Sequence, residues 1–449
     1  MKENDYPILF FGPSTLIQET RMKIRKIIKS LAVTTSLAFG GQLSAQELVV
    51  WHDLGDNGIK WFQSLSAEFA KTRPGVTVKS INYPTDQWFG RSISAINTNT
   101  APDLIYNNYE RVIRVSDQTN KLMDLKPVLA SVTDKAFLSE DDIRVATHGS
   151  KMIILPIQRV QMALGVRKSW LDKVGEKFPV TWADTQRVAV KFRDNDPDGD
   201  GKANTFGMAL QAAKPRDLIH MIDLFMFGSG LRHTLIDPQG KIVVDEPARA
   251  KVLEEVLKAY TESRYVAPDT INHSFAEMYQ IIEGSKAGMF RVGDWNVKKW
   301  DQATVLGGDF LVGPWPAFDG RKNSVVIGGM RGVAVPENSP NKAIAVEFAK
   351  FMLSKQAQQA SLDNVGSAVR KDLNISALSD RQKLFASPAW GLAAYDFPES
   401  VHAFYPELEA AYHRKLMGAL AKPPANWKAF ISETANEMRE LTTKLSAKK

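Results

Sequence analysis

Short apolar runs alternate along this chain with longer segments in which apolar side chains recur every three or four residues. The run at 47–52 is followed by a segment whose apolar residues 59, 62, 65 and 69 fall on one face of a helix, and then by a second run at 76–81. Strand, helix and strand in this order form a βαβ unit with two parallel strands. Because the alternation continues, the sequence predicts an α/β fold with a mostly parallel, doubly wound sheet.

Later segments predict further elements of the same kinds. Strands are expected at 104–106, 153–159, 205–209, 289–292 and 324–327, and helices at 182–192, 215–228 and 247–263, after Ser339-Pro340, and after Asn426. Thr181 and Asp184 have the spacing of a capping box, which marks a helix start. We expect the chain to cross between two lobes near Pro156. The order of elements assigns residues 46–156 with 294–331 to the first lobe, and 157–293 with 332–449 to the second.

The stretch from Ala287 to Trp295 combines an apolar strand with a carboxylate and a flat aromatic side chain. The strand is expected to end in a turn at Gly293, which brings Asp294 and Trp295 to the edge of the sheet. Ligands of open α/β sheets bind outside the carboxyl ends of the strands. An indole covers the apolar face of a sugar ring, and a carboxylate accepts its hydroxyl groups. The pattern is also typical of a tryptophan that fills the core after a turn, so both interpretations stay open.

Composition narrows the class of protein. The 449 residues are 44% hydrophobic and 24% charged, which is ordinary for a globular protein of two or three domains. The formal net charge is +7, but beyond the first 45 residues the basic side chains are scattered, so no nucleic-acid partner is expected. The chain has no cysteine, which excludes disulfides and the lipid anchor of a bacterial lipoprotein.

Residues 22–45 have the order of a secretory signal peptide. Met22 is followed by four basic residues, an apolar run at 31–39, and a small residue, Ala45, at the expected cleavage position. The apolar run is shorter than the roughly 20 residues that span a bilayer, which argues against a membrane anchor. Residues 1–21 lack this pattern and form an upstream extension, with a translation start at Met22 as the alternative. We therefore expect a protein that is exported to the periplasm.

The segment 196–204 is similar to the first nine positions of an EF-hand calcium loop. Its ligand positions are filled by Asp196, Asp198, Asp200, the Lys202 carbonyl and Asn204. The twelfth position holds a glycine where an EF-hand holds a bidentate glutamate. The segment is therefore either a structural calcium site of reduced affinity or an Asp/Gly-rich turn. No other cofactor is expected.

Taken together, these segments resemble the extracellular solute-binding proteins of ABC transporters, in the sugar-binding family (family 1) that includes the maltose-binding type. The matching stretches are 48–52, 101–105, 155–157, 179–182, 287–295, 339–342 and 366–370. The resemblance implies the class II periplasmic binding protein fold, with two doubly wound lobes joined by hinge crossover strands. It also implies a monomer without enzymatic activity that closes on a sugar or oligosaccharide in the interlobe cleft and delivers it to a membrane permease.

The same resemblance places ligand-binding residues on the loops that follow the strands. These residues are His52, Asp53, Asp56, Asn107, Asn108, Glu110, Arg111, Gln158, Arg159, Asp294, Trp295, Met330, Arg331 and Arg370. The chain departs from the family at Arg167-Lys168, where an Asn-Lys pair is usual. Its arginines also suit carboxylates and phosphates, so an acidic or phosphorylated sugar is an alternative ligand. Each arginine is equally explained as a surface residue or a salt bridge between lobes.

Two other classes of protein are alternatives. A secreted glycan-active enzyme needs two carboxylates across a cleft, which Asp53, Glu110 and Asp294 could supply, although nothing marks one of them as an acid. No phosphate-binding loop, nucleophile elbow or HExxH motif is present in the sequence. A peptide or metal-ion binder is the other alternative, and the scarcity of histidine and the absence of cysteine argue against metal cargo.

Overall fold

The computed structural model describes residues 46–134, 137–261, 265–318, 325–386, 391–394, 402 and 404–447. All of them belong to the compact unit that runs from Ala45 to Lys449. The expected signal peptide at 22–45 and the upstream segment 1–21 lie outside the described residues. Among the described residues, none of the helices combines the length and the apolar character that a bilayer crossing requires.

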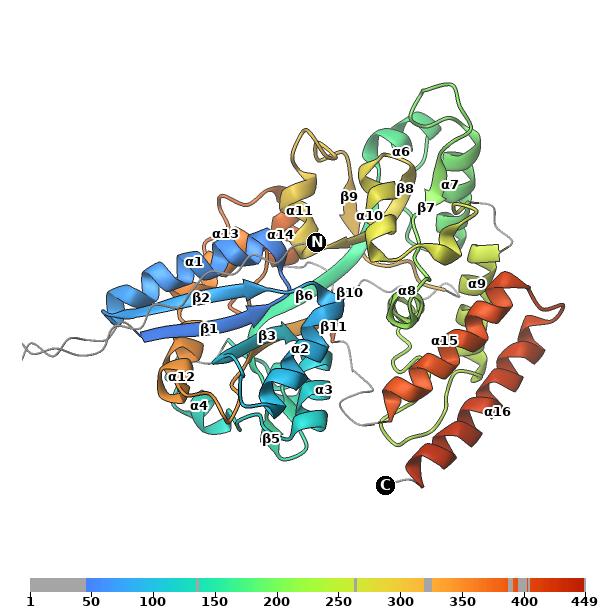
Figure 1. Cartoon of the computed structure of the whole chain (residues 1–449). Helices are drawn as coiled ribbons and strands as arrows, with labels where there is room; N and C mark the ends of the chain where they lie inside the picture. Colours follow the sequence, from blue (N-terminus) through green and yellow to red (C-terminus); the bar gives the residue numbers. More distant parts are fainter. Residues whose placement is uncertain are drawn as a thin grey trace, which may run out of the picture. The chain divides into compact units, whose positions relative to one another are not determined.

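The N-terminal part of the sheet is built from the predicted βαβ units (Figure 1). Its elements are β1 (Gln46–His52), α1 (Gly55–Thr72), β2 (Val76–Asn82), α2 (Thr85–Asn97), β3 (Leu104–Asn108) and α3 (Tyr109–Thr119). Strand β1 is parallel to both β2 and β3. The carboxyl ends of the three strands therefore meet at one edge of the sheet, where the loops after β1 and β2 and the start of α3 lie together. Helix α1 buries Trp61, Phe62, Leu65 and Phe69, which include three of the four predicted apolar positions.

Two long antiparallel strands occupy the middle of the sheet. Strand β6 (Leu155–Val166) pairs with β10 (Val325–Ala334), and the sheet order is β2-β1-β3-β10-β6-β8-β7. The register between β6 and β10 shifts between Arg331 and Gly332. Strand β10 extends beyond the strand expected at 324–327, so the glycines around Met330 lie inside it. Gly332 is required there, because a Cβ atom would lie 2.1 Å from the carbonyl oxygen of Leu155.

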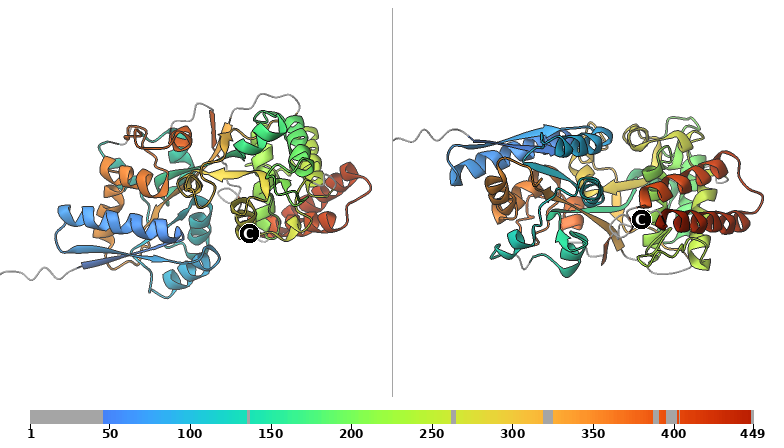
Figure 2. Two further views of the ribbon diagram at one scale, coloured as in Figure 1. Left: turned by 90° about the horizontal axis from the view of Figure 1, so that it is seen from above. Right: turned by 60° about the horizontal axis from the view of Figure 1, so that its bottom comes forward.

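The other end of the sheet has its own parallel pair. Strand β7 (Phe206–Met208) is parallel to β8 (Ala287–Gly293), β8 is antiparallel to β6, and β9 (Leu311–Gly313) also pairs with β6. The helices at this end are α6 (Lys168–Val174), α7 (Trp182–Asp194), α8 (Pro215–Gly228), α9 (Pro247–Thr261), α10 (Phe275–Glu283) and α11 (Asp294–Trp300). In both views of Figure 2, strands β1–β3 with their helices lie on one side of the central strands, and β7 and β8 with their helices lie on the other side.

Three helices pack against elements of the other lobe than the one to which the predicted boundaries assign them. Helices α12 (Lys342–Phe351) and α13 (Lys355–Val365) contact α4 (Lys126–Ala130) and α1, whereas α11 packs on β8 and β6. Helices α15 (Tyr405–Ala421) and α16 (Trp427–Ser446) pack with α8 and α9. The division into lobes itself stays a prediction. The remaining short elements are α5 (Glu140–Val145), β4 (Thr147–His148), β5 (Lys151–Met152), η1 (Thr270–Asn272), α14 (Asp380–Ala386) and β11 (Gly391–Ala394).

Helix starts follow the sequence in most cases. The capping box at Thr181 and Asp184 is present, and the Asn426 side chain caps α16 by accepting a hydrogen bond from the Ala429 N–H. The start predicted at Ser339-Pro340 is wrong by two residues, because α12 begins at Lys342. The Ser339 hydroxyl instead donates to buried Asp103 at 2.7 Å, which ties the segment before α12 to β3.

Candidate functional site

A buried carboxylate lies at the edge where β1, β2 and β3 end. Asp53 directly follows β1, and only 1% of its side chain is exposed. It accepts hydrogen bonds from Arg111 Nη1 at 2.6 Å and from Arg331 Nη1 at 3.2 Å, one on each carboxylate oxygen. The Thr85 hydroxyl, at the start of α2, donates to it at 3.1 Å. Four segments that are distant in the sequence are therefore joined by one side chain.

The charges at this edge support one another. Burial alone raises the pKa of Asp53, but the charges of Arg331 and Arg111 outweigh it and hold the pKa below its ordinary value. The side chains of Arg111 and Arg331 keep 24% and 19% exposure. Asp53 thus lies behind two arginine side chains that are partly exposed to solvent, an arrangement that can orient donors toward a ligand.

Histidine and asparagine side chains complete this edge of the sheet. His52 is fully buried and stacks on Phe62 with ring centroids 5.0 Å apart. Its burial, opposed by Asp53 and aided by Arg331, lowers its pKa to about 4, so the ring is neutral near pH 7. Asn107 is buried and accepts a hydrogen bond from Arg111 Nη1 at 3.1 Å. His52 therefore packs as a core residue, whereas Asn107 positions an arginine.

Three further predicted residues lie close by in the sequence but differ in their surroundings. Asn108 donates from Nδ2 to Glu110 at 3.1 Å. Glu110 belongs to the first turn of α3, where a polar loop was predicted, and it is buried. Asp56 is exposed in the first turn of α1. The structure brings Asn107, Asn108 and Glu110 to the start of α3, and leaves Asp56 on the surface.

Asp294 follows β8 and lies deep between the strands. It is 2% exposed, and its oxygens accept hydrogen bonds from the backbone N–H groups of Gln161 and Trp295, at 3.1 and 2.8 Å. Burial raises the pKa of Asp294 well above its ordinary value. The predicted turn at this point is instead the start of α11. Its carboxylate joins β6 to α11, and sequence reasoning had placed it at the mouth of the site.

Trp295 is half-buried beside two polar side chains from α10 and α11. Its Nε1 donates to the Tyr279 hydroxyl at 3.2 Å, and that hydroxyl donates to the Asn296 side chain at 2.9 Å. The indole folds back over Gly293, where a Cβ atom would lie 2.4 Å from its ring. One part of the ring therefore packs on the protein and another part remains open, so the contact with ligand stays a prediction.

Arg291 is a residue that sequence reasoning missed. It lies on β8, two residues before Gly293, and is 1% exposed. Its guanidinium lies 4.5 Å from the centre of the Phe275 ring, and its Nη1 lies 3.2 Å from His220 Nδ1. Phe275 begins α10 and is 37% exposed. The signal was the arginine itself, which interrupts an otherwise apolar strand.

Two predicted arginines lie away from Asp53. Arg159 is buried in an ion pair with Asp142, and it also donates to the carbonyl oxygens of Val369 and Phe137. Arg370 pairs with Asp372 at 2.8 Å and with Asp134 at 2.6 Å. Both arginines join chain segments around α5. Their geometry is that of structural salt bridges, which was the alternative interpretation.

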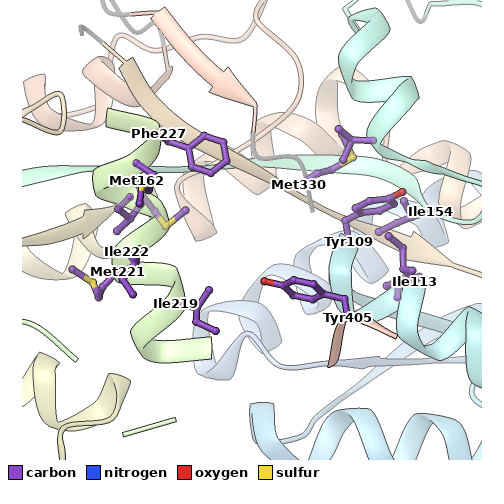
Figure 3. Packing of buried hydrophobic residues seen from close by; sticks show 14 of the residues in the cluster. Tyr109, Ile113, Ile154, Met162, Ile219, Met221, Ile222, Phe227, Met330 and Tyr405 are labelled. Atoms are coloured by element: carbon purple, nitrogen blue, oxygen red, sulfur yellow. The ribbon is translucent and has the colours of Figure 1, made fainter. Parts of the chain in front are cut away.

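Two uncharged predicted residues face the interior of the protein. Gln158 accepts a hydrogen bond from the Tyr106 hydroxyl and donates to Ser361 at 2.7 Å. Met330 is 4% exposed and belongs to the large core cluster. Figure 3 shows Met330 near Tyr109 and Ile154 and apart from the labelled residues of α8. In this structure Gln158 and Met330 are interior residues, and each directly precedes an arginine of its strand, Arg159 and Arg331.

The acidic loop forms a compact group on the surface. Asp196, Asp198 and Asp200 each bring one carboxylate oxygen within 4.8 Å of the others. Asn204 donates to Asp200 at 2.9 Å, and the Lys286 ammonium lies 3.8 Å from Asp198. The oxygens suit a hard cation such as calcium, while the lysine supplies an alternative positive charge. Calcium binding at Asp196, Asp198, Asp200, Lys202 and Asn204 therefore stays a prediction.

Asp53 and Asp294, two of the carboxylates considered for an enzyme, are both hydrogen-bonded to donors of the protein itself. Residues 55–359 match the family model described as bacterial extracellular solute-binding protein. That match covers more than half of the chain, and the protein belongs to this family. Members of the family are binding proteins for transport.

Individual relatives carry more specific names. One is a candidate ABC transporter periplasmic-binding protein, YcjN of Escherichia coli, with 27% identity over 212 residues, 46% of this chain and 45% of the relative. Another is the fructooligosaccharide ABC transporter substrate-binding protein FusA of Streptococcus pneumoniae, with 25% identity over 191 residues, 37% of this chain and 35% of the relative. The matches thus span less than half of these curated relatives.

Solved structures share the fold over most of the chain. The GacH receptor of Streptomyces glaucescens, studied unliganded and with acarbose, has a TM-score of 0.72 at 18% identity, covering 89% of this chain and 99% of that one. Maltose-bound MalE3 of T. maritima has a TM-score of 0.72 at 17% identity, covering 88% and 100%. The fold is therefore that of the maltose-binding type of periplasmic binding protein, as predicted.

Proposed function

We propose that this protein captures a sugar or oligosaccharide outside the cytoplasm and delivers it to the membrane permease of an ABC importer. The observation that carries the proposal is the pair of solvent-open arginines, Arg111 and Arg331, held by buried Asp53 at the end of β1. Fixed guanidinium donors bind hydroxyl oxygens in a set geometry. Half-buried Trp295 offers the aromatic face that a sugar ring requires.

The names of the relatives support this choice of ligand class. FusA is named for fructooligosaccharides, and the two structures above are described with acarbose and with maltose. The expected signal peptide at 22–45 and the periplasm as the site of action belong to the same proposal. A monomer that closes about β6 and β10 completes it, because these two strands connect the parts of the sheet that carry Asp53 and Trp295.

A thermal-shift screen of the purified protein against neutral and acidic mono- and oligosaccharides tests the proposal. A ligand present at 100 times its Kd should stabilise the folded state by about 2.7 kcal/mol, which is a measurable rise in Tm. Chromatography of the sugar after incubation is the companion measurement. New products would indicate a glycan-active enzyme, and the absence of any shift across the library would contradict a sugar-binding role.

A further inference from the structure

Arg291 is a buried cation with an unused hydrogen-bonding edge. It is 1% exposed, and its Nε and Nη2 atoms have no hydrogen-bond partner within the described part of the chain. Its Nη1 faces His220 Nδ1 at 3.2 Å. An arginine keeps its charge at any accessible pH, and an unpaired buried charge is costly. The Nε/Nη2 edge of Arg291 is therefore either satisfied by internal water or reserved for a group from outside.

Other arginines of this protein show what the same edge binds. Arg159 directs Nε and Nη2 to the two carboxylate oxygens of Asp142, and Arg370 directs them to those of Asp372. Arg193 holds Asp194 in the same way. Each pair is a side-on fork that matches a planar carboxylate with two parallel hydrogen bonds. Arg291 presents the same fork without a carboxylate within ion-pair distance among the described residues, and the Tyr279 hydroxyl and the more distant Asp217 carboxylate compensate its charge only in part.

The position of Arg291 connects this fork to the proposed sugar site. Phe275, whose ring lies 4.5 Å from the guanidinium, also contacts Tyr279 with centroids 4.4 Å apart. Tyr279 in turn accepts the hydrogen bond from Trp295. Phe275 is 37% exposed and stacks on the face of the guanidinium, so Arg291 lies one side chain away from solvent on this side and two contacts away from the tryptophan.

We propose that the Nε/Nη2 edge of Arg291 binds the carboxylate of an acidic sugar, so that the ligand is a uronate-containing saccharide. The inference rests on the proposed function and names the ligand class of the same site. Trp295 contacts the ring, the Arg291 fork takes the carboxylate, and Phe275 moves aside as the sugar enters. A neutral sugar leaves the fork unpaired and forgoes this contact.

Isothermal titration of the full-length mature protein tests the inference with two matched ligand series. The acidic series contains galacturonate and glucuronate oligosaccharides, and the neutral series contains galactose and glucose oligosaccharides of the same lengths. The wild type should prefer the acidic series by at least tenfold. Arg291→Lys keeps the charge but loses the fork, so it should weaken acidic ligands at least tenfold and leave neutral ones unchanged. Arg193→Met removes a fork outside the site and should change neither series.

The outcomes separate the inference from the proposed function. A wild type that binds neutral sugars as tightly as acidic ones would overturn the inference and leave sugar binding intact. Equal affinity of Arg291→Lys and the wild type for uronates would mean that internal water fills the fork. Preference for a sugar phosphate over the uronate would equally refute a carboxylate site. Binding of no sugar in either series would refute the proposed function itself. A wild type without a preference for uronates would overturn the inference even if the variant fails to fold.

Discussion

Replacement of Asp53 by asparagine should destabilise the protein strongly, although the two side chains have nearly the same shape. The carboxylate is 1% exposed and compensates two guanidinium groups, Arg111 and Arg331, which approach its two oxygens at 2.6 and 3.2 Å. An amide accepts on one side only and carries no charge. Asp53→Asn therefore leaves two positive charges near each other without an anion between them.

The expected loss follows from the contacts. Breaking a buried ion pair costs about 3–5 kcal/mol, and losing one charge-assisted hydrogen bond costs roughly 1.5–3 kcal/mol. Because Arg111 and Arg331 are partly exposed, water compensates part of the repulsion, and we expect a loss of about 2–4 kcal/mol in the free energy of unfolding. With an unfolding entropy of about 2.1 cal/mol/K per residue, the chain of 449 residues should melt roughly 2–4 °C lower.

Differential scanning calorimetry and urea unfolding at pH 7 measure this effect. The pKa of Asp53 is held below its ordinary value, so its contribution is present above pH 4 and is lost as the pH falls through the folded pKa. Asp172→Asn removes an exposed partner of Lys168 and is the matched control, with no measurable change in stability expected. Adding Arg331→Met to Asp53→Asn should recover part of the loss. The reasoning fails if Asp53→Asn stays within about 0.5 kcal/mol of the wild type.

Four further predictions concern separate features. Trp295→Ala should weaken sugar binding at least tenfold, about 1.4 kcal/mol, and Trp295→Phe should recover part of the lost affinity. If titration gives wild-type affinity for Trp295→Ala, the indole is a packing residue. Arg159→Met leaves Asp142 unpaired and should therefore lower the free energy of unfolding, measured with urea, by about 3–5 kcal/mol. A stable variant with an altered ligand preference would instead mean that Arg159 belongs to the binding site. His52 has a folded pKa of about 4 against an ordinary 6.5, so the protein should lose stability as the pH falls from 6.5 to 4. His52→Phe should make the Tm depend less on pH in this range. If the Tm of the variant and of the wild type depend on pH in the same way, His52 is not a buried neutral ring. Calcium at 196–204 should raise the Tm and a chelator should lower it without abolishing sugar binding, whereas identical melts would leave the loop a turn.

The sequence predicts the local elements of this fold well. Helix α8 spans the predicted 215–228, and the capping box at Thr181 is formed, because periodicity and caps depend on residues a few positions apart. The packing of α12 and α13 against α4 and α1 was not predictable in this way. Their partners lie more than 200 residues earlier in the chain, and an amphipathic helix does not reveal which sheet face it covers.

The candidate site was predictable in part, for a similar reason. Asp53 and Arg111 follow apolar strands, so their place at a strand end could be read from the sequence. Arg159 also follows an apolar run, but its partners Asp142 and Val369 lie 17 and 210 residues away. The position of Arg291 could have been predicted from the alternation of side chains along a strand. Its neighbours Phe290 and Val292 lie on the opposite face of β8, which is apolar.

The register shift in the central strands has a mechanical consequence. The ladder between β6 and β10 runs from Leu155 opposite Val333 to Met162 opposite Ile327, and it is interrupted between Arg331 and Gly332. A bulge of this kind bends a strand locally and disrupts the ladder, and Pro156, opposite Gly332, also lacks an N–H to donate. Arg331 stands at this irregularity and contacts Asp53. In the proposed closure, a ligand that contacts Arg331 would act next to the irregularity, so that one residue would connect ligand capture with the movement of the central strands.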